Sequence, residues 1–164
     1  MPPAVTSPMP PTATCAGWTG WTPPLQRSAF HDDAHVDCGL FVGDADGFVA
    51  FAQDMLAAME ATHHLLGQQR IEIHGPDQAS GECYFQAWHG IRDEEGAPRD
   101  LFICGRYIDE YTCKNGEWRI SRRKLITDWV KNDPADHSFY AANPATNRPG
   151  RGGADFSQKR DWPC

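Results

Sequence analysis

The sequence predicts an α+β domain in which one long helix precedes an antiparallel sheet. Between Asp44 and Met59, apolar residues recur at three- and four-residue steps, the pattern of a helix with one buried face. Four strand-like segments follow in succession, and one of the turns between them carries the Asn115-Gly116 pair typical of a tight hairpin. Consecutive hairpins build an antiparallel sheet, against which the helix would pack.

The composition indicates one globular domain and argues against several functional classes. A chain of 164 residues with 40% apolar residues can bury a substantial core. A net charge of -7 disfavours a nucleic-acid-binding surface, which needs a basic excess. No apolar run is long enough to span a membrane, so we expect a soluble, cytoplasmic protein. The six cysteines form no C-x-x-C pair and are expected to be reduced thiols, several of them buried.

Three segments differ in composition. Residues 1–27 form a Pro-rich tail: residues 1–26 carry no charged side chain and hold seven of the thirteen prolines, which disfavours a regular helix. Residues 28–131 hold the expected domain. Residues 132–164 form a polar tail rich in Gly, Pro and Asn, with a possible anchor at Phe139-Tyr140.

The first half of the domain supplies the helix. Residues 30–34 are interpreted as a short helix end and turn, and residues 35–41 as a strand. Asp44 is a candidate N-cap, and Asp46 lies in the first turn, where the helix dipole favours negative charge. A stripe of apolar side chains follows, which is typical of core but could also roof a ligand cavity: Phe48, Phe51, Ala52, Met55, Leu56 and Met59.

The second half supplies the strands, predicted at residues 69–74, 82–91, 101–112 and 118–130. The pair His63-His64 lies where the helical pattern gives way to the first of these strands. In the second strand, alternation places Phe85 and His89 on the same face. In the fourth, strict alternation groups Arg123 with Trp129, unless a bulge intervenes.

Several motifs in this order resemble the SnoaL-like branch of the nuclear transport factor 2-like superfamily. They are Thr-x-His-x-x-Gly at residues 62–67, an aromatic strand ending in His89, Gly-Arg-Tyr-x-Asp at 105–109, Asn-Gly-x-Trp-Arg-Ile at 115–120, and Asp-Trp at 128–129. The subgroup containing scytalone dehydratase, bile acid 7α-dehydratase and hexachlorocyclohexane dehydrochlorinase is most similar. The resemblance implies a cone-shaped, curved antiparallel sheet wrapped around helices, with an apolar pocket. Here the Pro-rich tail stands in place of the usual first helix.

The resemblance also implies the site residues. The histidine of the Thr-x-His-x-x-Gly pattern is His64, which would act as the catalytic base, with His89 and Arg123 as further catalytic groups. Histidine suits proton abstraction because its pKa lies near neutrality. On the residues alone, each of these three side chains could instead be structural. The expected substrate contacts are Phe51, Met55, Phe85, Tyr107 and Trp129, and Asp109 could simply hold the sheet edge.

Two functions remain open at this stage. The first is a cofactor-free lyase (a dehydratase or dehydrohalogenase) or an isomerase, acting on a small apolar cyclic or steroid-like compound. The second is a non-catalytic ligand-binding or assembly subunit, because the chain has no Tyr or acidic residue before His31 and has Cys38 at a position where a related dehydratase has tyrosine. We expect no metal site, since His31 and His35 have no third ligand and should face solvent. A homo-oligomer, dimer or trimer, is expected.

Overall fold

The computed structural model describes residues 22–136, 138–150 and 154–162, so most of the predicted N-terminal tail lies outside the described residues. The helices and strands run in the order α2 (Pro23–Ser28), β1 (Phe30–Asp37), β2 (Val42–Asp44), α3 (Ala45–Ala57), β3 (Ala61–Ile73), β4 (Gln78–Arg92), β5 (Pro98–Lys114), β6 (Glu117–Pro134), α4 (Ser138–Ala142) and α5 (Phe156–Lys159). None of the helices within these ranges is both long and apolar enough to cross a bilayer.

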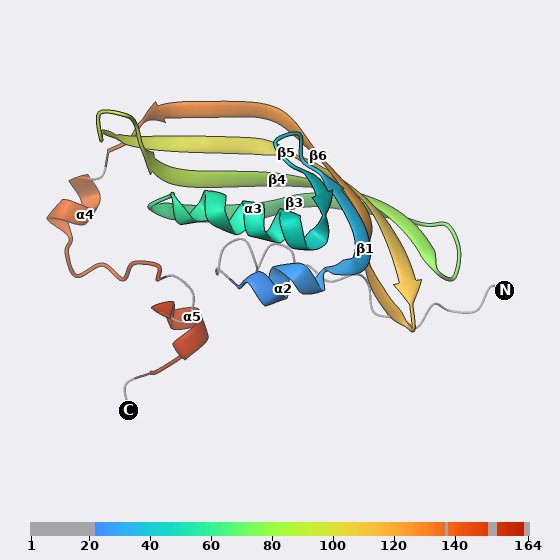
Figure 1. Cartoon of the computed structure of the whole chain (residues 1–164). Helices are drawn as coiled ribbons and strands as arrows, with labels where there is room; N and C mark the ends of the chain where they lie inside the picture. The colour runs from blue at the N-terminus through green and yellow to red at the C-terminus, as the bar shows by residue number, and fades with distance from the viewer. Residues whose placement is uncertain (1–21, 137, 151–153, 163–164) are drawn as a thin grey trace.

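Six strands form one strongly curved sheet in the order β2-β1-β6-β5-β4-β3, and α3 lies against its concave side, with α2 beyond it (Figure 1). The predicted antiparallel hairpins β3-β4, β4-β5 and β5-β6 are all present. The sheet is nevertheless mixed, because β1 pairs with β6 in parallel. This pairing brings the first strand beside the last and extends the sheet around the helix. The α+β prediction is confirmed.

The long helix follows the sequence closely. The Asp44 side chain accepts a hydrogen bond from the backbone N–H of Gly47 at 2.8 Å, which caps the helix N-terminus as predicted. In the apolar stripe, four side chains are buried in the main core, whereas Phe51 and Met55 are only partly buried. The buried members are Phe48, Ala52, Leu56 and Met59. The core therefore lies between α3 and the concave face of the sheet.

The structure corrects several local predictions. Residues 30–34 are not a helix end but the start of β1, which pairs with β6 from Phe30 onward. His64 does not lie at a helix–strand junction, because β3 already begins at Ala61. Residues 23–28 form a short helix despite two prolines, since both prolines occupy the first turn, where a missing N–H costs nothing.

The C-terminal segment is not anchored as predicted. Phe139 is 60% exposed, and Phe139 and Tyr140 contact each other edge to face. Neither α4 nor α5 packs substantially against another described element. In Figure 1 both lie apart from the sheet.

Among the described cysteines, all four are free thiols, and Cys83 and Cys104 are buried. This agrees with the expectation of reduced thiols.

Candidate active site

Two histidines meet on the concave face of the sheet. His64 on β3 lies opposite Ala87 on β4, and His89 lies two residues further along β4, on the same face. The Nε2 atoms of the two rings are 3.1 Å apart, and the ring planes are nearly perpendicular, at 87°. At this distance one Nε2 carries a hydrogen that the other accepts, so the two imidazoles share one proton.

Burial keeps both histidines neutral. Burial, together with smaller contributions from the neighbouring His89 and His63, lowers the pKa of His64 to about 3. Burial also lowers the pKa of His89, although the backbone of Leu101 opposes this shift. The Nδ1 atom of His89 is buried and makes no hydrogen bond of ordinary geometry within the described residues. At neutral pH the pair is therefore uncharged and partly unsatisfied.

Arg123 belongs to a different, fully buried cluster. Its Nε and Nη2 atoms donate to the two oxygens of Asp109, at 2.7 and 2.6 Å, in a bidentate ion pair across β5 and β6. The Tyr111 hydroxyl donates to the same carboxylate at 3.0 Å. The guanidinium also stacks 4.1 Å from the centre of the Tyr107 ring. Burial alone would lower the pKa of Arg123, but the Asp109 carboxylate outweighs this effect and raises it.

The histidine pair and the arginine cluster occupy different parts of the concave face. Asp109 lies opposite Gly81 on β4, whereas His89 lies eight residues further along that strand. At a rise of about 3.3 Å per residue, this separation is about 26 Å measured along the strand. The stacked rings of Phe85 and Tyr107, with centroids 4.6 Å apart, lie between them. The structure thus brings His64 and His89 together, and Arg123 is not part of that group.

The remaining predicted contacts are also dispersed. Phe85 and Tyr107 are buried on the concave face and belong to a small second core. Phe51 stacks on Phe41 at 5.6 Å, and Met55 packs at the border of the main core. No single cavity wall is formed by these four side chains in the described contacts.

Trp129 lies on the opposite, outer face of the sheet. Gly105 pairs with Thr127, but the preceding residue, Cys104, pairs with Trp129, so Asp128 is an extra residue in β6. Such a bulge inverts the alternation of side chains along the rest of the strand. Trp129 therefore lies with Cys104 on the outer face, where it is 49% exposed. A bulge at Asp128 therefore does separate Trp129 from the face that Arg123 occupies.

Two further interpretations are corrected. Asp109 does not hold a sheet edge, because β5 is an interior strand and the carboxylate is buried beneath Arg123. His31 does not face solvent: it is buried, and its Nε2 donates to the carbonyl oxygen of Thr112 at 2.9 Å. Sequence reasoning missed Asp109 as the partner of Arg123. Its position between Tyr107 and Tyr111 on one face of a central strand was the available signal.

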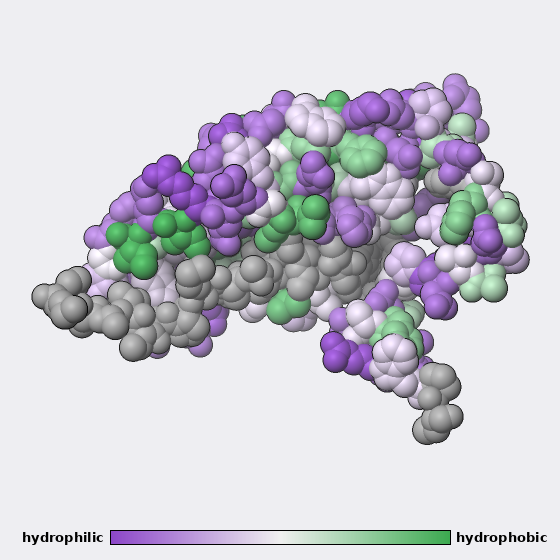
Figure 2. All heavy atoms as spheres, turned by 180° about the vertical axis from the view of Figure 1, so that it is seen from behind, coloured by the Kyte–Doolittle hydropathy of each residue, from purple (hydrophilic) through white to green (hydrophobic). Residues whose placement is uncertain are grey.

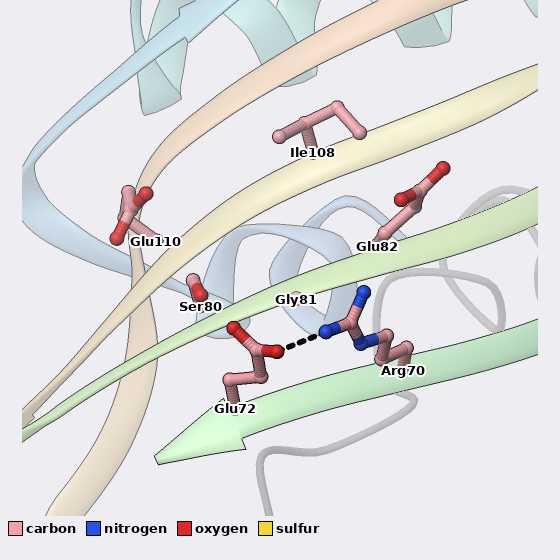
Figure 3. A pocket seen from close by; sticks show the side chains of 7 residues that line it. All are labelled: Arg70, Glu72, Ser80, Gly81, Glu82, Ile108 and Glu110. Carbon is pink, nitrogen blue, oxygen red and sulfur yellow. Dashed lines mark hydrogen bonds and ion pairs between the residues drawn. The ribbon is translucent and has the colours of Figure 1, made fainter. Parts of the chain in front are cut away.

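Described residues of β3, β4, β5 and β6 line two hollows on the outer face. The first, of about 220 Å³, is lined by charged and polar side chains from β3, β4 and β5, as Figure 3 shows: Arg70, Glu72, Ser80, Glu82, Ile108 and Glu110, with Gly81 at its base. The second, of about 360 Å³, is more apolar and includes Leu65, Tyr84, Gly105 and Trp129. Within the described ranges, no cluster of three or more His, Cys, Asp or Glu side chains is arranged to hold a metal ion.

Solved structures share this fold. A type 2 hexachlorocyclohexane dehydrochlorinase superposes with a TM-score of 0.69 at 19% identity, over 85% of this chain and 88% of that one. A scytalone dehydratase-like protein from Novosphingobium aromaticivorans gives 0.62 at 18% identity, over 74% and 81%. A β subunit assigned to an aromatic-ring-hydroxylating dioxygenase of the same organism gives 0.56 at 20% identity, over 75% and 90%.

Comparison with curated protein sequences finds no match. The SnoaL-like domain, in contrast, matches residues 21–124, which comprise most of the chain. Together with the curved sheet and the helix it encloses, this match shows that the chain belongs to the SnoaL-like domain family.

Proposed function

We propose that this protein is a cofactor-free lyase, a dehydratase or dehydrohalogenase, or an isomerase, and that the pair His64–His89 performs its proton transfer. The substrate is a small, largely apolar cyclic or steroid-like compound. The observation that carries the proposal is the 3.1 Å contact between two buried, neutral imidazoles. The dehydrochlorinase and dehydratase names among the similar structures agree with a lyase reaction.

The chemistry follows from the state of the pair. A neutral imidazole of His64 takes the proton from carbon and becomes an imidazolium. The same proton then passes to the departing hydroxyl or halide in a lyase reaction, or returns to another carbon in an isomerase reaction. In both cases His64 ends neutral, and no external oxidant or cofactor is needed. His89 receives or supplies the hydrogen on the shared Nε2 contact and so selects the tautomer of His64.

The low pKa of His64 restricts the substrates. An imidazole whose conjugate acid has a pKa of about 3 is a weak base, so it removes only a proton that is already acidic. Suitable C–H bonds lie next to a carbonyl group or in a ring that becomes aromatic on elimination. The imidazolium formed in this step stabilises the negative charge that develops on the substrate, and this stabilisation lowers the barrier further.

Arg123 has no direct part in this proposal. Its guanidinium is held by Asp109 and lies far along the sheet from the histidines. We assign it a structural role in its own part of the sheet, where it joins β5 to β6. Phe85 and Tyr107 of the second core lie between the two groups and provide apolar surface on the concave face.

The test compares neighbouring histidines on opposite faces. The wild type is assayed against a panel of cyclic alcohols and halides with activated C–H bonds, together with His64→Ala, His89→Ala and His63→Ala. Loss of His64 should lower kcat by about 10²-fold or more, as is usual for a general base. His63 is exposed on the outer side of β3 and provides the matched control. Equal loss in all three variants would contradict the proposal.

A second candidate is a non-catalytic ligand-binding or assembly subunit. The observation that favours it is that the two histidines already hydrogen-bond to each other through their Nε2 atoms, as two structural groups can. The likeness to a dioxygenase β subunit agrees with it. Tryptophan fluorescence distinguishes the two: a panel compound that binds wild type and His64→Ala equally, with no turnover in either, supports the second candidate.

We place this activity in the cytoplasm, since the described cysteines are free thiols. We also propose that the protein works as a homo-oligomer.

A further inference from the structure

The outer face of the sheet and the α5 segment, residues 154–162, each expose apolar side chains that have no place in the core. On the outer face, Leu65, Tyr84 and Trp129 are about half exposed around one hollow. In the α5 segment, Phe156 and Trp162 are 45% and 73% exposed, and their rings meet edge to face at 4.8 Å. Large exposed apolar groups of this kind mark sites of protein contact.

The α5 segment is already folded into a compact unit. The Asp155 side chain caps the helix by accepting from the backbone N–H of Ser157 at 2.9 Å, and it also accepts from Gly150. The chain reverses at Arg160, which has a left-handed backbone with φ 47°. This turn brings Trp162 back onto Phe156. The two rings and the adjacent basic side chains of Lys159 and Arg160 therefore form one preorganised, exposed knob.

The outer face offers a matching arrangement of apolar and acidic groups. The apolar hollow adjoins the polar hollow of Figure 3 through Arg106, which binds Glu82 at 3.0 Å and lies over the Tyr84 ring at 5.7 Å. Within the polar hollow, Glu72 pairs with Arg70, and Glu110 makes no ion pair with a described residue. Figure 2 shows the molecule from behind, where hydrophilic side chains surround isolated apolar patches.

Charge favours contact between two copies of this chain. After residue 137 the chain holds four of its fifteen basic residues but only two of its twenty-two acidic residues. The C-terminal part is therefore net positive, and the rest of the chain is strongly negative. Opposite net charges attract the two surfaces and disfavour the pairing of like surfaces.

The position of α5 makes the contact intermolecular. It lies on the helix-covered side of its own sheet, away from the outer face (Figure 1). It also packs against no other described element extensively, so few existing contacts would have to break before it docks.

We propose that the α5 segment of one copy docks on the outer face of a second copy. Phe156 and Trp162 enter the apolar hollow beside Tyr84 and Trp129, and Lys159 and Arg160 face the carboxylates of the polar hollow. If docking is reciprocal, the assembly is closed and symmetric: each copy docks its own α5 segment on another copy and binds an α5 segment on its own outer face. This proposal does not depend on the function proposed above.

The first experiment is sedimentation velocity of the full chain over about a hundredfold range of concentration. The wild type should self-associate, and Phe156→Ser/Trp162→Ser should weaken its self-association by about tenfold or more, since aromatic anchors dominate interface energies. Leu40→Ser is the matched control, because Leu40 is 82% exposed in the turn between β1 and β2. Circular dichroism verifies that each variant is folded.

The second experiment exchanges charges. Lys159→Glu/Arg160→Glu should weaken self-association, and adding Glu110→Lys on the receiving face should restore part of it. A wild type that stays monomeric over the whole range would overturn the proposal, as expected if α5 folds back on its own copy. Equal association of the wild type and the double serine variant would also overturn it.

Discussion

The two ends of the concave face use buried polar groups in opposite ways. At one end, Arg123 and Asp109 form a bidentate ion pair that Tyr111 completes, and charge there is matched by charge. At the other end, His64 and His89 hydrogen-bond to each other, and burial keeps both uncharged. The first arrangement is a matched ion pair, whereas the second is a neutral hydrogen-bonded pair with the acid–base chemistry of imidazole. We infer that the arginine end supports the fold and the histidine end is available for chemistry.

The largest effect is expected at the arginine end. Asp109→Ala leaves the Arg123 guanidinium buried without its partner, so we expect a loss of about 3–5 kcal/mol in unfolding free energy. Urea denaturation measures this loss. The exposed pair Lys114–Asp33 is the control, and Asp33→Ala should leave the unfolding free energy nearly unchanged. If Asp109→Ala and Asp33→Ala changed the unfolding free energy equally, the structural role that we assign to Arg123 would be contradicted.

A second effect is expected between the two ends. In Gly105→Ala the new Cβ would lie 2.1 Å from the carbonyl oxygen of Ile126, which belongs to the backbone and cannot turn away. We expect a loss of about 2–4 kcal/mol, since the bulge must shift to relieve the overlap. Thermal unfolding provides the measurement. Gly116→Ala is no suitable control because of its positive φ, and Gly75→Ala serves instead. A neutral Gly105→Ala would show that the bulge adapts freely.

At the histidine end, we expect His64 to make the unfolding free energy depend on pH. The pKa of His64 in the folded protein lies below its value in the unfolded chain, so low pH favours the unfolded chain, which binds the proton more readily. The stability that this difference affects is fully present above about pH 6.5 and is lost as pH falls toward 3. His64→Phe removes the titrating group. Between about pH 7.5 and 4.5 we expect the wild type to lose about 2 kcal/mol more stability than this variant. His63→Ala should keep the wild-type dependence, and identical slopes in all three proteins would contradict the buried, neutral state of His64.

The smallest effect is expected at Trp129. Because this side chain is on the outer face, Trp129→Ala in dilute solution should change the unfolding free energy by less than about 1 kcal/mol. It should also leave turnover unchanged, as measured by kcat/KM on any compound that responds to His64→Ala. If Trp129→Ala instead lowered substrate affinity selectively, that result would support the predicted contact between Trp129 and the substrate.

The sequence predicted regular periodic features well. The helix stripe, the Asp44 cap and the Asn115-Gly116 turn each depend on residues close together in the chain. The meeting of His64 with His89 could not be predicted in this way, because the first strand was expected to begin at residue 69, whereas β3 begins at Ala61 and carries His64. Their 3.1 Å contact also depends on the exact register of β3 against β4.

The errors arose where the register changes. Counting outward from the Asn115-Gly116 turn places Asp109 opposite Arg122, but Ser121 is an extra residue, so Arg123 takes that position. A one-residue shift decides whether the arginine is buried or exposed. In the same way, the parallel pairing of β1 with β6 involves segments nearly ninety residues apart, beyond any local pattern.

The extra residue Asp128 reverses the alternation of side chains along β6. Before it, Arg123 and Leu125 face the interior; after it, Trp129 faces outward, although strict alternation would group it with Arg123. Because neighbouring side chains still alternate on both sides of this point, each part of the strand contributes to both faces of the sheet. Deleting Asp128 would therefore exchange the two faces for the residues that follow it in β6, whereas a single substitution there changes only one face.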